Sequence, residues 1–313
     1  MTTLRSLVQE VRALRTQKWG NKMGYLFVLP AFALFLMFNT WPIFRGLLMA
    51  FQDYRFLIPE STGLFSAFNG IANFQEMARD PKFWHSFGIS LKFTAMLFPL
   101  DILVALLVAI LLSNLGENTL VPVHRVIVYL PVVLPIAAAM LVWGQLYNEQ
   151  FGYLNVLLSN LFGKAARIRW LGSVQWALPA TVIASLWKGF GYNTMLFLIG
   201  IYNINRELYE AAAIDGAGRF RQIWSITLPL LRPIMTLVLV LSVGIFSATE
   251  QVMILTNGGP AESTMTLGLY LYRVAFTWGD MRMGYAASMN LIVGLINMFL
   301  AALVFRLMRA ERA

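Results

Sequence analysis

The chain has 313 residues, of which 58% are hydrophobic and 12% are charged, and its formal net charge is +9. A soluble domain usually carries about 25% charged residues, so this composition excludes an ordinary soluble domain and indicates an integral membrane protein. The sequence contains no cysteine, which excludes disulfides and thiolate metal sites. His85 and His124 lie far apart without metal-ligand spacing, so no metal site is predicted.

Residues 1–24 form a polar N-terminal segment that precedes the first apolar run. The segment carries five basic residues, Arg5, Arg12, Arg15, Lys18 and Lys22. The apolar run that begins at Tyr25 is longer than the apolar core of a signal peptide and is not followed by a small-x-small cleavage site. We therefore expect an uncleaved first span and a cytoplasmic N-terminal segment.

Six segments of the chain are long and apolar enough to cross a bilayer, which takes about 20 residues. Their apolar runs are continuous rather than alternating, so they predict helices and not a barrel. The predicted fold is an all-α membrane protein with six transmembrane helices within residues 25–308. The spans are 25–50, 86–113, 125–147, 176–203, 234–256 and 284–308.

The orientation is predicted from the basic residues, which accumulate on the cytoplasmic side. The five positive residues before the first span place the N-terminus inside. With six spans, the C-terminal tail at 309–313 and the connection at 204–233 are then cytoplasmic as well. The charge of +9 is attributed to such loops and not to a nucleic-acid partner, because no basic soluble domain is present.

The connection at 204–233 is polar and has a helical pattern. Ala211 and Ala212 favour a short helix, and the sequence Asp215-Gly216 ends it, since glycine tolerates a positive φ. A second short helix follows and has an apolar face of Phe220, Ile223 and Trp224. Taken alone, this pattern also fits an amphipathic surface helix that Arg219 and Arg221 hold at anionic headgroups.

The spacing within this connection resembles a known signature. Glu-Ala-Ala, three residues, Gly, nine residues and Ile-x-Leu-Pro match Glu210, Ala211, Ala212, Gly216, Ile226, Leu228 and Pro229. This is similar to the cytoplasmic loop of permeases from binding-protein-dependent ABC importers, and the likeness extends over roughly residues 25–308. The resemblance implies the type I ABC importer transmembrane-domain fold.

In that family the loop forms a coupling helix that sits in a cleft of the ATPase subunit. The resemblance implies that Glu210 is the charged contact, that the alanines permit close approach and that Gly216 forms the bend. The residues expected to couple this chain to an ATPase are Glu210, Ala211, Ala212, Asp215, Gly216 and Arg219.

A second resemblance concerns the connection after the fifth span. The run Leu255-Thr-Asn-Gly-Gly-Pro260 is similar to the extracytoplasmic loop of carbohydrate permeases of the maltose type. This likeness implies a sugar, such as an oligosaccharide or sugar derivative, as the transported solute. It also implies that Gly258, Gly259 and Pro260 help to form the surface that receives the solute-binding protein.

Charged residues inside spans are costly and usually functional, which directs attention to Asp101, Lys188 and Glu250.

Ser185, Lys188 and Tyr192 share one helix face. Together with Gly189, they align with the sugar-contacting region of the maltose permease, although the side-chain types differ. In the fifth span, Ser247 and Glu250 belong to a polar patch. The predicted substrate pathway is Ser185, Lys188, Gly189, Tyr192, Ser247 and Glu250.

Two structural alternatives remain open for these charged residues. Lys188 and Glu250 can pair across the bundle merely to satisfy each other. Asp101 is expected to support internal packing rather than to touch substrate.

No P-loop occurs in the sequence, since Gly163-Lys164 lacks the upstream glycine, and no catalytic constellation stands out. The chain is therefore expected to bind no cofactor itself and not to be an enzyme, and ATP and Mg are used by a partner ATPase. The expected partners are a second permease subunit, with a distinct homologue favoured over a second copy, two ATPase subunits, an extracytoplasmic solute-binding protein and the lipid bilayer.

The expected location is the plasma (inner) membrane of a bacterium or archaeon. One alternative is the same machine for glycerol phosphate or another anionic solute, which Lys188 and the basic cluster Lys164, Arg167 and Arg169 would suit. Another is a secondary transporter, but the sequence shows no duplicated halves.

Overall fold

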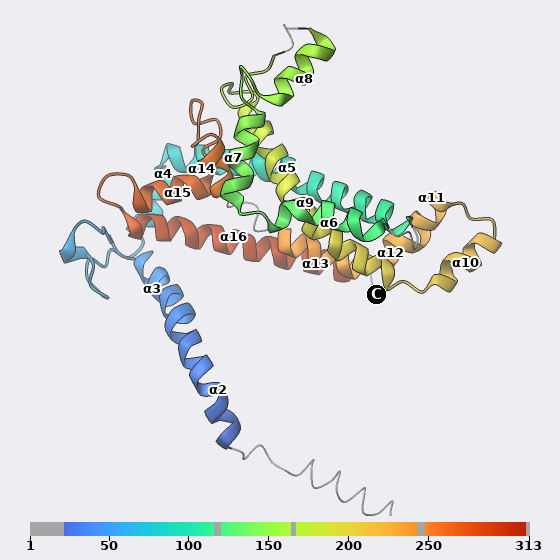
Figure 1. The fold of residues 1–313 in the computed structure, drawn as a ribbon. Helices are drawn as coiled ribbons and strands as arrows, with labels where there is room; N and C mark the ends of the chain where they lie inside the picture. Colours follow the sequence, from blue (N-terminus) through green and yellow to red (C-terminus); the bar gives the residue numbers. More distant parts are fainter. Residues whose placement is uncertain (1–21, 116–119, 164–166, 243–247, 311–313) are drawn as a thin grey trace, which may run out of the picture.

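The computed structural model describes residues 22–115, 120–163, 167–242 and 248–310. Within these ranges the chain is helical, apart from loops and one isolated antiparallel bridge between Gln52 and Phe68. The predicted all-α architecture is confirmed (Figure 1). The first half contains α2 (Lys22–Phe35), η1 (Leu36–Thr40), α3 (Trp41–Met49), η2 (Pro59–Ser61), α4 (Ala72–Arg79), α5 (Pro81–Ser113), α6 (Val121–Val133), α7 (Ile136–Leu146) and α8 (Tyr153–Phe162). The second half contains α9 (Ala177–Tyr202), α10 (Arg206–Ile214), α11 (Arg219–Gln222), η4 (Ile223–Thr227), α12 (Leu228–Leu230), α13 (Arg232–Ser242), α14 (Glu250–Leu255), α15 (Leu267–Phe276) and α16 (Met283–Ala310).

The helices provide up to six membrane spans by length and composition. Four are long single spans, at Phe27–Met49, Pro81–Ser113, Ala177–Tyr202 and Met283–Met308. Two more arise if each pair of helices joined at a bend is counted as one span. This number agrees with the six predicted spans, but the second bent pair, Arg219–Leu230 with Arg232–Ser242, overlaps the predicted fifth span only at 234–242. The fifth predicted span begins at α13 and reaches α14, and residues 243–247 between them lie outside the described residues.

The third predicted span, 125–147, is wrong as a continuous helix. The structure breaks it into α6 and α7, which meet at an angle of 98°. Pro135 has no N–H to donate, and Leu134 before it is extended, with a ψ of 140°. Pro135 therefore bends the chain between α6 and α7. The last carbonyl groups of α6 are left without helical partners.

The core of the bundle lies along α5 and α9, which pack against each other over most of their lengths. Phe93 and Leu97 of α5 meet Val182 of α9 in one buried cluster. Further along, Phe197 of α9 joins Val238 of α13 in a second cluster. Large apolar side chains elsewhere stay exposed, as expected for surfaces that face lipid or other subunits.

The first span stands apart from this bundle. Figure 1 shows α2 and α3 extending away from the other helices, with α3 next to the beginning of the long helix α16. No residue in the most hydropathic window of this span is buried. The span contains apolar residues over its whole surface, and most of them are exposed in the part of the chain that the structure describes.

Three connections contain helices that the sequence analysis did not predict. They are α4 before the second span, α8 in the third connection and α15 in the fifth. These helices are short or strongly mixed in character, so they lack the sustained apolar run that marks a span.

The start of α5 is organised by Asp80. Its carboxylate accepts a hydrogen bond from the backbone N–H of Lys82 at 2.9 Å, which caps the helix. The hydroxyl groups of Tyr270 and Tyr285 donate to the same carboxylate at 2.6 and 2.7 Å. One acidic side chain thus joins α5, α15 and α16 at this end of the bundle.

Acid is expected to loosen this junction. Burial raises the pKa of Asp80, but the hydrogen bonds from Tyr270, Tyr285 and the backbone outweigh burial and lower the pKa below its ordinary value of 3.8. The stabilisation is therefore complete above pH 3.8 and disappears as the pH falls through the lowered pKa of the folded protein. Thermal unfolding followed from pH 7 to about pH 2 should show this loss, and Asp80→Asn should lower the melting temperature at pH 7 and flatten the acid limb. An unchanged acid limb in the variant would contradict this role.

Candidate functional site

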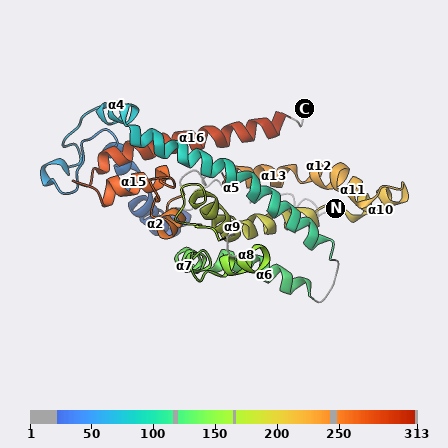
Figure 2. The same ribbon diagram turned by 90° about the horizontal axis from the view of Figure 1, so that it is seen from above.

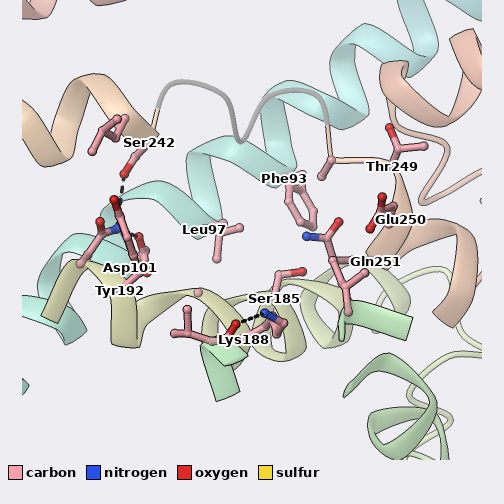
Figure 3. A pocket seen from close by; sticks show the side chains of 16 residues that line it. Phe93, Leu97, Asp101, Ser185, Lys188, Tyr192, Ser242, Thr249, Glu250 and Gln251 are labelled. Atoms are coloured by element: carbon pink, nitrogen blue, oxygen red, sulfur yellow. Dashed lines mark hydrogen bonds between the residues drawn. The ribbon is translucent and has the colours of Figure 1, made fainter. Parts of the chain in front are cut away.

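A cavity of about 660 Å³ lies in the middle of the bundle (Figure 3). Its walls come from α5, α9, the bend between α6 and α7, the end of α13 and the beginning of α14. Of the six residues predicted for the substrate pathway, five line this cavity: Ser185, Lys188, Gly189, Tyr192 and Glu250. Ser247 lies outside the described residues.

The helix α9 presents its predicted polar face to this cavity. Ser185 is buried, and its hydroxyl oxygen has no hydrogen-bond partner in the described part of the chain. Tyr192, two turns further along, keeps 46% of its surface exposed. Gly189 between them leaves open space, because a Cβ atom built there would meet nothing within 4 Å. The helix therefore offers a hydroxyl, a phenol and a gap on one side.

Lys188 is held by the bend between α6 and α7. Its Nζ donates a hydrogen bond to the backbone carbonyl of Val132 at 3.1 Å, as Figure 3 shows. That carbonyl belongs to the last turn of α6, where helical partners are missing and the helix dipole favours a cation. No ion pair joins Lys188 to Glu250 in the described structure, so the proposed structural pairing of these two residues does not form there.

Asp101 takes part in both packing and the cavity wall. It is 4% exposed, and its Oδ2 accepts a hydrogen bond from Asn193 of α9 at 2.5 Å. Asn193 also lies 3.5 Å from the hydroxyl of Ser242 on α13. The expected packing role is therefore visible, but Asp101 also lines the cavity, and its Oδ1 has no hydrogen-bond partner among the described residues.

The wall opposite α9 comes from α14, where Thr249, Glu250 and Gln251 line the cavity. Apolar side chains, among them Phe93 and Leu97 of α5, complete the lining. Such a mixture of a few polar groups with apolar and aromatic faces is typical of small-molecule sites. Sequence reasoning missed Asn193 and Ser242 as part of this site, although each is a polar residue inside an apolar helix and could have been flagged on that ground.

The connection at 204–233 has the predicted form of helix, break and second helix. The first helix, α10, ends in a Schellman motif: the N–H of Gly216 donates to Ala213 at 3.0 Å, and that of Ala217 donates to Ala212 at 2.8 Å. This motif needs a left-handed residue, and Gly216 has a φ of 80°. The turn then leads into α11.

Hydrogen bonds hold the two short helices together. Gln222 of α11 donates to the carbonyls of Tyr209 and Ala217, and the Tyr209 hydroxyl lies 2.9 Å from that of Thr227. Both helices project from one end of the bundle in Figures 1 and 2. No residue of α10 is buried.

The residues predicted for ATPase coupling lie mostly on the open surface of this loop. Glu210, Ala211, Asp215, Gly216 and Arg219 are exposed, and Ala212 is half-buried. Glu210 lies 3.9 Å from Arg206, and both side chains remain largely in solvent. The loop thus offers a protruding, small-residue surface within this chain.

The turn that contains Gly258, Gly259 and Pro260 is closely packed. Gly258 is buried with a φ of 85°, and a Cβ atom there would lie 2.7 Å from the end of Met265. The Thr264 hydroxyl donates to the carbonyl of Gly259 at 2.8 Å. Gly259 and Pro260 are half-buried, and their neighbours Asn257, Ala261 and Glu262 are exposed at the surface of the turn.

Comparisons with known proteins place the chain among transport proteins. A family model described as "Binding-protein-dependent transport system inner membrane component" matches residues 101–312. The probable ABC transporter permease protein YurN of Bacillus subtilis is 31% identical over 92% of this chain and 96% of its own length. The lactose transport system permease protein LacF of Rhizobium radiobacter is 30% identical over 95% of this chain and 97% of its own length. The trehalose/maltose transport system permease protein MalF of Thermococcus litoralis is 31% identical over 85% of this chain and 88% of its own length.

A solved structure establishes the fold. A chain of a bacterial ABC transporter involved in the import of the acidic polysaccharide alginate superposes with a TM-score of 0.77 at 23% sequence identity. The match covers 97% of this chain and 99% of that chain. The predicted importer fold is therefore confirmed.

Proposed function

This chain belongs to the family of inner-membrane components of binding-protein-dependent transport systems, and we propose that it forms the sugar-conducting part of an ATP-driven importer. Members of the family are transport subunits and not enzymes. The observation that carries the proposal is the convergence of α9 and α14 on one cavity, which brings together residues that lie about 60 positions apart in the sequence. Tyr192 supplies an aromatic face, and hydroxyl, amide and carboxylate groups supply the hydrogen bonds that a sugar needs.

A neutral sugar suits this cavity better than glycerol phosphate or another multiply charged anion. Two carboxyl groups, from Asp101 and Glu250, line the described cavity, whereas Lys188 is the one cation on its wall there. Lys188 also directs its ammonium to a backbone carbonyl. Relatives named for lactose, for trehalose and maltose, and for diacetylchitobiose support an oligosaccharide as the cargo.

The importer requires further subunits. The exposed coupling loop would seat in an ATPase that uses ATP and Mg, and a second permease subunit, a distinct homologue or another copy, would complete the pore and cover the first span. A solute-binding protein would dock at the opposite end, near Asn257, Ala261 and Glu262. In this arrangement both termini and the loop at 204–233 are cytoplasmic, in the inner membrane of the cell.

Reconstitution tests the proposal directly. The chain is purified with its co-expressed subunits, placed in proteoliposomes and supplied with its loaded solute-binding protein over a panel of oligosaccharides and sugar phosphates. Uptake that needs ATP, and ATPase activity stimulated by the loaded binding protein, are the expected results. Uptake that persists without ATP but requires an ion gradient would indicate a secondary transporter instead.

Tyr192→Ala is expected to lower uptake by up to about tenfold, because an aromatic contact is worth about 0.5–1.5 kcal/mol beyond the area that it buries. Assembly should stay intact, since Tyr192 is 46% exposed and belongs to none of the buried hydrophobic clusters of the described residues. Tyr153→Ala, which changes a 66% exposed tyrosine on α8 outside the cavity, serves as the matched control. Equal uptake by both variants at all solute concentrations would remove Tyr192 from the pathway.

A further inference from the structure

A second cavity, of about 670 Å³, lies between the coupling loop and the bundle. One side is formed by the ends of α5 and α9 and the first part of α6, and the other side by α10, α11 and η4. It is separate from the central cavity, with which it shares no lining residue. The polar side chains on its wall are Ser113, Asn114, Arg125, Tyr202, Arg206, Tyr209, Arg219, Gln222 and Thr227.

The charge of this cavity is entirely positive. Three arginines line it, Arg125 from α6, Arg206 from α10 and Arg219 from α11, and no carboxylate lines its described wall. Arg206 approaches Glu210 only to 3.9 Å, in a pair whose side chains are 88% and 68% exposed, so this contact neutralises little of its charge. Three guanidinium groups from three helices repel one another unless an anion lies between them.

Arg125 is already positioned for such an anion. Its guanidinium stacks over the ring of Tyr202 at 5.2 Å, and its Nη2 donates to the Tyr202 hydroxyl at 2.7 Å. Its Nε is buried and has no hydrogen-bond partner among the described residues. A buried N–H donor without a partner costs free energy, which a bound acceptor would recover.

We propose that this cavity binds a phosphate-bearing anion, held by Arg125, Arg206 and Arg219. Guanidinium groups match the oxygens of a phosphate in planar, two-bond geometry, and the neutral groups of Asn114 and Tyr209 can complete the shell. The anion is the headgroup of an acidic phospholipid or a free phosphate compound, since both present the same oxygens. Because the arginines come from the bundle and from both short helices of the loop, the bound anion braces the coupling loop against α6.

The test measures binding to the purified, assembled importer in detergent. Thermal unfolding is followed while three probes are titrated: dioctanoyl phosphatidylglycerol, sodium phosphate and the zwitterionic dioctanoyl phosphatidylcholine. We expect saturable stabilisation by at least one of the two anions and none by phosphatidylcholine. Stabilisation by phosphatidylglycerol alone identifies a lipid site, and stabilisation by phosphate identifies a site for soluble anions.

Arg125→Gln is expected to weaken this binding about tenfold, as the loss of one charge-assisted contact should. Arg206→Gln is the second variant, because its largely exposed side chain can be changed without disturbing the packing around Tyr202. Arg221→Gln is the matched control: Arg221 lies on the same short helix as Arg219 and is exposed, but it does not line the cavity.

The site is refuted if no anion stabilises the complex, or if Arg221→Gln weakens binding as much as the cavity variants. The measurement involves no transport, so its failure leaves the proposed function untouched.

Discussion

Replacing Gly216 by valine is expected to lower ATP-driven uptake by at least about tenfold, while the chain still inserts and assembles. Gly216 has a φ of 80° at the end of α10, where the Schellman motif requires a left-handed residue. An L-residue in that region costs about 1–2 kcal/mol, and branching at Cβ adds to the strain. The variant loop would therefore abandon this turn and carry Glu210 and the alanines away from the proposed ATPase cleft.

The decisive measurement is the ATPase activity of the reconstituted importer with and without loaded binding protein. In the Gly216→Val variant we expect the basal hydrolysis to remain and its stimulation to be lost. Gly218→Ala is the matched control, because Gly218 has an ordinary φ of −67° and a Cβ atom there meets nothing within 4 Å. Full stimulation in Gly216→Val would show that the shape of this turn does not transmit the ATPase signal.

Gly191→Ala is expected to destabilise the whole chain, even though it adds a single methyl group. A Cβ atom at Gly191 would lie 2.3 Å from the backbone carbonyl oxygen of Val128 and 3.1 Å from the side chain of Val132. The first of these atoms is backbone, so α6 as a whole has to move away from α9. Overpacking of this kind typically costs about 1–3 kcal/mol. Because Val132 also accepts the hydrogen bond from Lys188, the cavity wall would shift with the helix.

Gly189→Ala is the matched control, because it separates the effect of overpacking from the effect of helix propensity. Gly189 lies on the same helix two residues earlier, gains the same propensity on substitution, and has open space around a new Cβ atom. Thermal unfolding of the purified complex should show a lower melting temperature for Gly191→Ala than for Gly189→Ala. Gly189→Ala should assemble normally, so its uptake kinetics can be measured and will show whether the cavity is used. Equal melting temperatures would show that α6 and α9 do not pack this closely.

The features that could be predicted from the sequence are those with local physical causes. Each span must satisfy its own backbone hydrogen bonds within the bilayer, so apolar runs alone located the spans. The helical period placed Ser185, Lys188 and Tyr192 on one face, and they do line one cavity. The bend at Pro135 was also readable from a local cause, but the apolar run continues through it and conceals it.

Which of these helix faces meet depends on packing between distant segments, and the sequence does not show it. Helical periodicity defines a face but not the helix that lies opposite, so the partner of Lys188 proved to be the Val132 carbonyl and not Glu250. The same limit applies to Arg125, Arg206 and Arg219, which belong to three segments and form one basic cavity only after the chain has packed. The positions of the apolar runs, the family signature and the form of the loop at 204–233 could be predicted from the sequence, because these depend on neighbours along the chain. The two cavities depend on contacts between residues far apart in sequence, and only the packed structure could reveal them.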